Sequence, residues 1–204
     1  MAQDPAHELP TYTRAARLFH WLVAFLVLIQ LPVGLYMVYR GNDMEGVNDK
    51  GEPVKGVWNG INDNGLTDTL YNSHKLVGIT ILLLVLWRLA YRLTRGVPPS
   101  DPTVPAALTG VSHLLHWSIY ALLIAVPIIG YVGTSYYGAL DVFGLPLPAV
   151  TAKDEKFSKE VFELHEYAAF TLLALVVVHF GAALFHKFVR KDRVVERMLP
   201  KRVV

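Results

Sequence analysis

The stretch of sequence that decides the fold is residues 160–189, EVFELHEYAAFTLLALVVVHFGAALFHKFV. It is apolar over most of its length and long enough to cross a ~30 Å hydrocarbon layer as a helix. It nevertheless carries His165, His179 and His186. On a helix, the spacing of His165 and His179 places them ~21 Å apart along the axis and ~40° apart in projection. Imidazoles are costly inside a membrane, so two of them on one helix face indicate functional positions at two depths.

The rest of the chain supplies further apolar blocks. Hydrophobic residues make up 53% of the 204 residues, without a repeat or a second polar domain. Strand-type alternation is absent, which argues against a membrane barrel. The blocks are long enough to span a bilayer with some tilt, and they predict helices at residues 15–39, 70–93, 113–136 and 161–189. We therefore expect an all-α protein, an integral membrane four-helix bundle in which residues 1–204 form one domain.

The charges predict the orientation of this bundle. Basic residues gather at the start of the first helix and at the ends of the second and fourth, whereas residues 41–73 carry six carboxylates against Lys50 and Lys55. Because basic loops stay in the cytoplasm, both termini are expected there, and in a bacterium the acidic loops then face the periplasm. The net charge of +2 reflects this asymmetry and predicts no nucleic-acid partner.

This orientation sets the depth of each histidine. His20 lies near the cytoplasmic side and His74 near the periplasmic side, so the depths pair His74 with His165 and His20 with His179. Two pairs of imidazoles at two levels of a helical bundle match bis-imidazole ligation of two haems, with these four residues as metal ligands. The chain has no cysteine, which excludes iron–sulfur clusters, covalent haem attachment and disulfides as intrinsic features. We therefore expect two haem b groups, stacked across the bilayer.

Small and basic residues are candidates for holding these groups. Gly34 and Gly130 fall at the depth of the outer haem, where a missing side chain would let a porphyrin pass close to the helix. Haem carboxylates need cations at the membrane boundary. Arg14, Arg17 and Arg88 are placed for the inner haem, and Lys75 for the outer one. The alternatives stay open, since glycines are common in membrane helices and positive-inside topology alone explains arginines.

His116 and His186 remain at the cytoplasmic interface. A titratable imidazole can supply protons to a quinone near neutral pH, so both are candidate catalytic residues beside a quinone head group. The alternative is that they only hydrogen-bond lipid headgroups or backbone.

A resemblance covers the chain from Arg14 to Pro200. The strings are RLFHWL at 17–22, HKLVG at 74–78, GVSHLLH at 110–116, PIIG at 127–130, HE at 165–166, and KD at 191–192 followed by MLP at 198–200. Together they resemble the bacterial cytochrome b-561 family, and within it the superoxide oxidases. The resemblance implies a di-haem b protein of the bacterial inner membrane with His20, His74, His165 and His179 as axial ligands. It also implies a cytoplasmic quinone site near His116 and His186, and periplasmic oxidation of superoxide.

The chain departs from the superoxide oxidases at two places: the first departure keeps a second function open, and the second concerns the quinone pocket. Residues 41–73 form a loop longer than expected for superoxide oxidases, and its acidic charge would repel superoxide. The linker after Arg95 also lacks the basic residues of close relatives. The chain is therefore either a superoxide:ubiquinone oxidoreductase or an electron-transfer subunit that accepts electrons from a periplasmic redox protein or dehydrogenase. A third hypothesis is a non-haem metal transporter. It is disfavoured because transporters usually pair histidines with carboxylates inside the membrane, whereas the acidic residues near the helices of this chain are interfacial.

Overall fold

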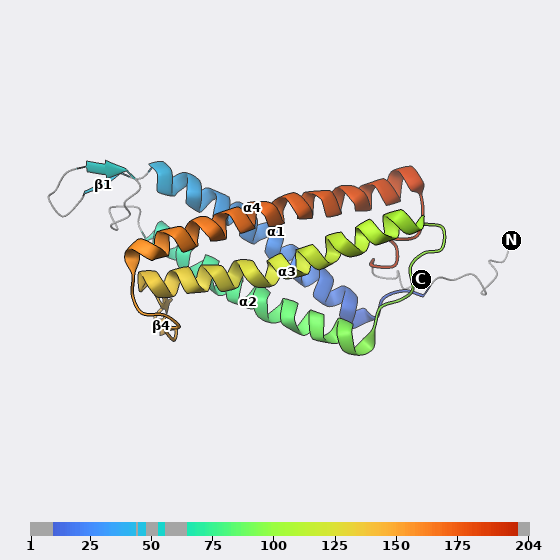
Figure 1. The fold of residues 1–204 in the computed structure, drawn as a ribbon, viewed down its shortest axis with the longest axis horizontal. Coiled ribbons are helices and arrows are strands. Elements are labelled where there is room, and N and C mark those ends of the chain that lie inside the picture. The colour runs from blue at the N-terminus through green and yellow to red at the C-terminus, as the bar shows by residue number, and fades with distance from the viewer. Residues whose placement is uncertain (1–9, 44, 48–52, 56–64, 200–204) are drawn as a thin grey trace.

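The computed structural model describes residues 10–43, 45–47, 53–55 and 65–199, and its main feature is a bundle of four long helices (Figure 1). They are α1 (Arg14–Asp43), α2 (Leu66–Arg95), α3 (Ala106–Tyr137) and α4 (Glu155–Leu184), and a π-helical turn, η2 (Phe185–Arg190), continues α4. Each is long and apolar enough to cross a membrane. The expected membrane bundle is therefore confirmed.

The helices extend beyond the predicted apolar blocks. The third begins at Ala106 and not at residue 113, and the second begins at Leu66 and not at residue 70. The fourth begins at Glu155 but leaves α-helical geometry after Leu184. Apolar composition marks the part of a helix inside hydrocarbon, whereas the backbone continues as helix into the polar boundary until a cap stops it. Gly96 and Gly138, both with positive φ, provide such stops after α2 and α3.

Short strands, which the sequence did not predict, connect helices at one end of the bundle. β1 (Glu45–Val47) pairs with β2 (Pro53–Lys55), and β3 (Asp141–Val142) pairs with β4 (Leu145–Pro146). Phe143 and Gly144 between β3 and β4 both have positive φ, as a tight hairpin turn requires. We call this the hairpin end. The opposite end, where α1 and α3 begin and α2 and α4 finish, is called the basic end.

The buried core is thin and follows the bundle axis. Its members are Val23, Val27, Ile81, Val85, Tyr120, Leu123 and Leu172. Most large hydrophobic side chains lie outside it, and examples more than 60% exposed occur on all four helices: Leu18, Leu83, Leu114 and Phe180. Exposed apolar surface on every helix suits contact with lipid. Backbone packing is closest between α3 and α4, then between α1 and α2, with α2 joining the two pairs.

Candidate functional site: two imidazole pairs

At the hairpin end, α2 and α4 bring His74 and His165 together. Their ring centroids are 6.1 Å apart and their planes are inclined by 77°. His165 Nδ1 lies 2.9 Å from the carbonyl oxygen of Val126. Since a carbonyl only accepts, Nδ1 carries the proton, and the neutral ring presents an unprotonated Nε2. His74 Nδ1 is buried and has no hydrogen-bond partner among the described residues.

Glycines make room for both rings of this pair. A Cβ atom at Gly130 would lie 2.9 Å from Nδ1 of His165, and one at Gly34 would lie 3.4 Å from Cε1 of His74. The first distance is too short for any side chain, so α3 can approach His165 only with glycine at this position. The sequence placed these glycines at the depth of the outer haem. The structure adds that each faces one of the two histidines.

At the basic end, α1 and α4 bring His20 and His179 together. Their ring centroids are 6.2 Å apart, again with planes inclined by 77°. The two pairs thus have nearly the same geometry, and α4 contributes one ring to each. Both pairings are those expected from the depth of the residues in the sequence.

Arg88 is the cation that contacts the basic-end pair. Its Nη1 atom lies 2.8 Å from Nδ1 of His20, and its Nε donates to the hydroxyl of Tyr120 at 2.9 Å. A guanidinium only donates, so Nδ1 of His20 accepts here and the proton of the neutral ring is on Nε2. Metal binding through Nε2 therefore requires Arg88 to leave Nδ1, and Tyr120 would remain as its partner.

The other basic residues have different surroundings. Arg17 donates from Nη1 to the carbonyl oxygen of Leu199 at 2.7 Å. Lys75 donates to the carbonyl oxygens of Ala139 and Asp141, which holds β3 against α2. Arg14 is exposed at the start of α1. The propionate roles expected for these side chains remain predictions, and only Arg88 touches a predicted ligand.

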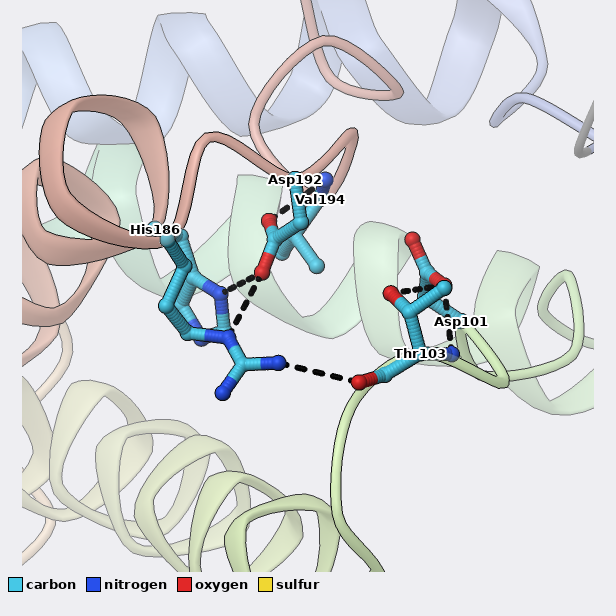
Figure 2. A network of polar contacts seen from close by, with 6 residues as sticks. Asp101, Thr103, His186, Asp192 and Val194 are labelled. Carbon is cyan, nitrogen blue, oxygen red and sulfur yellow. Dashed lines mark hydrogen bonds and ion pairs between the residues drawn. The ribbon is translucent and has the colours of Figure 1, made fainter.

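The two candidate catalytic histidines have separate sets of contacts. The ring of His116 lies 5.1 Å from that of His179, and its Nδ1 is 3.3 Å from Oγ of Ser112. His186 lies in η2, where its Nδ1 is 2.6 Å from Oδ2 of Asp192 (Figure 2). His116 is thus beside the basic-end pair itself, and His186 is in a polar network at the end of α4.

Figure 2 shows that this network joins the end of α4 to the α2–α3 loop. Arg190 donates to Oδ2 of Asp192 and to the carbonyl oxygen of Thr103. The backbone N–H and the hydroxyl of Thr103 in turn donate to Oδ1 of Asp101. Burial acts to raise the pKa of Asp192, but hydrogen bonds from His186, Val194 and Arg190 outweigh it and lower this pKa below its usual value.

Comparison with known proteins identifies the family. The prokaryotic cytochrome b561 family matches residues 11–201. A probable superoxide oxidase, CybB of Yersinia pestis, is 28% identical over 193 residues, covering 90% of this chain and 92% of the relative. Cytochrome b562 of Cereibacter sphaeroides is 30% identical over 197 residues, or 95% of this chain and 98% of the relative. Cytochrome b561 homolog 1 of Escherichia coli is 25% identical, with 90% and 93% coverage.

The chain therefore belongs to the prokaryotic cytochrome b561 family, which consists of membrane-embedded haem b proteins of electron transfer. The residues of this chain fit such a group. One metal bound by two imidazoles through bonds of ~2 Å separates their ring centroids by roughly 6 Å, close to the distances in both pairs. The fixed tautomer of His165, the unpartnered nitrogen of His74 and the glycine facing His165 agree with this fit at the hairpin end.

Other residues near the pairs escaped the sequence analysis. Gln30 donates from Nε2 to the carbonyl oxygen of His74 at 2.8 Å. A lone amide inside the apolar stretch of α1 was a usable signal, because polar groups in hydrocarbon need partners. Tyr120 gave no such signal, since its partner Arg88 comes from another helix.

Proposed function

We propose that this protein is a di-haem cytochrome b that takes electrons from superoxide at its hairpin end and delivers them to ubiquinone at its basic end. The hairpin end would face the periplasm and the basic end the cytoplasm of a bacterial inner membrane, with both termini cytoplasmic. His74 with His165, and His20 with His179, would be the axial ligands. The superoxide oxidase name of the Yersinia pestis relative supports the choice of substrate.

The observation that carries this proposal is the repeated geometry of the two ring pairs. Their centroids are separated by 6.1 and 6.2 Å, and α4 provides His165 to one pair and His179 to the other. Bound haem supplies a reversible one-electron acceptor at each level. A second copy of the same geometry at another depth would let electrons cross the membrane from one level to the other.

The overall reaction balances with one quinone for every two superoxide anions. Two superoxide anions each lose one electron and leave as dioxygen, and ubiquinone gains two electrons and two protons to become ubiquinol. In this proposal the protons enter at the basic end. His186 can hold one on the nitrogen opposite Asp192, and His116 can hold one beside His179.

The alternative is a cytochrome subunit that receives electrons from a periplasmic redox protein or dehydrogenase. What favours it is the stretch of residues 41–73, which covers the end of α1, the connection and the start of α2 and carries six carboxylates and two lysines. Such a segment would repel an anion but could dock a basic protein. Trp58 and Ile61, which are candidate packing positions in this segment, lie outside the described residues.

Purified holoprotein in detergent tests the proposal. A pyridine haemochrome assay should give two haem b groups per chain. Enzymatically generated superoxide should reduce them, and ubiquinone should reoxidise them. Reduction only by a partner protein would favour the alternative function.

His165→Ala should remove the same spectral component as His74→Ala, and His179→Ala the same component as His20→Ala. Equal spectra for His165→Ala and His179→Ala would contradict the ligand pairing.

A further inference from the structure

Residues 191–199 form a segment of which the proposed function uses only Asp192, although it contains the family-like string KD at 191–192 and part of MLP at 198–200. It follows η2 and turns back toward the start of α1 (Figure 1). We call residues 191–199 the C-terminal clasp.

The clasp meets α1 through consecutive backbone carbonyls. The carbonyl oxygen of Met198 accepts from Nε1 of Trp21 at 2.9 Å, and that of Leu199 accepts from Nη1 of Arg17 at 2.7 Å. The carbonyl oxygen of Arg197 lies 3.4 Å from the amide nitrogen of Tyr12, just before α1. Contacts to adjacent carbonyls fix the register of the clasp on α1, because a shift by one residue would break them together.

Arg197 anchors the clasp on two further segments. Its side chain is 6% exposed, and it donates to the carbonyl oxygens of Pro10 at 3.0 Å and Pro99 at 2.7 Å. Its guanidinium also lies 5.8 Å from the centre of the Tyr12 ring. Among the described ion pairs it has no carboxylate partner. A buried cation satisfied by carbonyls is costly to remove, since those carbonyls would lose their donors.

The other end of the clasp is fixed to α4. Lys191 has a positive φ of 55°, which turns the chain out of η2. The following residue, Asp192, then accepts from His186 at 2.6 Å and from Val194 at 3.2 Å (Figure 2). The clasp thus begins directly after η2, which continues α4, and it ends in contact with α1.

This bridge matters because α1 and α4 carry the basic-end pair but do not pack closely on each other. In the described part of the chain, the closely packed helix pairs are α3 with α4, α1 with α2, and α2 with α3. Trp21 directly follows His20, and the two rings lie 5.3 Å apart. The clasp therefore holds α1 at the residue next to His20, and holds α4 at His186, two turns beyond His179.

We propose that the C-terminal clasp is a positioning element for the basic-end haem: it fixes the separation of α1 and α4 so that His20 and His179 stay at the spacing of one shared metal. The inference rests on the proposed ligand role of these two histidines. It makes no claim on the hairpin-end pair, which α2 and α4 hold without the clasp. The second haem therefore serves as an internal control.

The test uses holoprotein with Trp21→Phe and Arg197→Gln, separately and together. Phenylalanine keeps a ring beside His20 but removes the Nε1 donor, and glutamine removes the buried guanidinium. The matched controls are Trp87→Phe and Arg193→Gln. Trp87 is an exposed residue of α2 whose ring contact with Phe19 phenylalanine can keep, and Arg193 is an exposed arginine of the clasp itself. Each variant is measured for haem content, for the midpoint potential of each haem and for the low-spin electron paramagnetic resonance signal of each.

We expect Trp21→Phe to weaken retention of the basic-end haem about fivefold, as the loss of one hydrogen bond would. Arg197→Gln, which removes a guanidinium that makes two hydrogen bonds, should weaken it at least as much. Both variants should shift the potential and the resonance signal of this haem. The hairpin-end haem and both controls should match the wild type. Unchanged basic-end signals would overturn the inference. Equal loss of both haems would also overturn it, because the clasp would then be a general stabilising element.

A distance measurement separates this inference from the ligand assignment. The chain has no cysteine, so spin labels at Leu18→Cys on α1 and Phe188→Cys on η2 report the α1–α4 separation alone. Both positions are more than 60% exposed. Trp21→Phe and Arg197→Gln should broaden the distance distribution, and an unchanged distribution would contradict the clasp. A wild-type protein with one haem would instead contradict the proposed function, while the distances would still test the clasp.

Discussion

At the scale of single residues, the hairpin-end pair depends on the absent side chain of Gly130 as well as on the two imidazoles. A hydrogen bond to a backbone carbonyl of α3 fixes the tautomer of His165, and Gly130 of the same helix leaves room for the ring to approach. The carbonyl of Val126 and the absent side chain of Gly130 are one helical turn apart. A single helix therefore both orients the ring and makes space for it.

Gly130→Ala tests this arrangement. The added Cβ would lie 2.9 Å from the His165 ring, so the ring or α3 must shift. We expect a cost of about 1–3 kcal/mol, with loss or altered potential of the hairpin-end haem while the basic-end haem is retained. Redox titration of the purified variant measures both.

Two other glycines calibrate that result. Gly34→Ala, whose Cβ would lie 3.4 Å from His74, should have a smaller effect on the same haem. Gly181→Ala is the neutral control, because nothing described lies within 4 Å of its added Cβ. If Gly130→Ala had the potentials of Gly181→Ala, the close approach of α3 to His165 would have no functional consequence.

At the scale of elements, the sequence predicted the helices well and the connections poorly. Apolar blocks and histidine spacing were sufficient for four helices and for the pairing of His20 with His179 and His74 with His165. They could not give the helix ends, since Ala106 and the residues after it are helical outside the apolar block. The partners of Arg17 and Lys75 are carbonyls of distant segments, and only the folded chain brings these together.

The turn after α4 has a predictable dependence on pH. The pKa of Asp192 is lowered by its hydrogen bonds to His186, Val194 and Arg190, despite its burial. A carboxyl whose folded pKa lies below its unfolded value of ~3.9 stabilises the fold above that value and loses this contribution as pH falls through the folded pKa. Thermal unfolding in detergent should therefore show a loss of stability below about pH 4.

Asp192→Asn isolates the contribution of this carboxyl. The amide cannot ionise, so the variant should be less stable than the wild type at pH 6, and the difference should shrink as the pH falls toward 3. Glu160→Gln, at an exposed position of α4, controls for general loss of negative charge. A difference that stayed constant with pH would show that ionisation of Asp192 does not hold this turn.

Within α3 and η2, His116 and His186 test where the quinone reacts. His116 is beside His179, and His186 has Asp192 on one nitrogen. We predict that His116→Ala and His186→Ala keep both haems and their reduction by the donor. In His186→Ala, Arg190 still donates to Asp192 and holds the start of the clasp on η2. Stopped-flow reoxidation by ubiquinone should slow at least tenfold, or ~1.4 kcal/mol of barrier. His113→Ala, at an exposed position of α3, is the control.

The outcomes of that experiment separate ligand from proton donor. Loss of a haem in His116→Ala would make His116 a ligand in place of His20, since its ring is even nearer to His179. Unchanged reoxidation in both variants would move the quinone away from these residues.

At the scale of the whole molecule, charge separates the two ends. The clustered arginines and lysines lie at the basic end, whereas the α1–α2 connection at the hairpin end has four carboxylates and two lysines, and Asp43 and Asp68 flank it at the ends of the two helices. Over residues 138–160, which run from the end of α3 into the first turns of α4, the charges are nearly balanced and do not offset this excess of negative charge. A donor that approaches the hairpin end therefore meets a negative field on its way to the His74–His165 pair.

The sign of the salt dependence of haem reduction follows from this field. Superoxide is an anion, so screening the hairpin end should raise its second-order rate constant as ionic strength increases from about 0.01 to 0.15 M, where the Debye length falls from ~30 to ~8 Å. Stopped-flow reduction by superoxide at constant pH measures it. Replacing Asp49, Glu52 and Asp63 by their amides should raise the low-salt rate and flatten the salt dependence, whereas the amide at Glu196, an exposed carboxylate of the basic end, should change it less. A basic protein donor would give the opposite sign, because screening removes an attraction. A rate that falls with salt for the physiological donor would therefore favour the electron-transfer subunit over the superoxide oxidase.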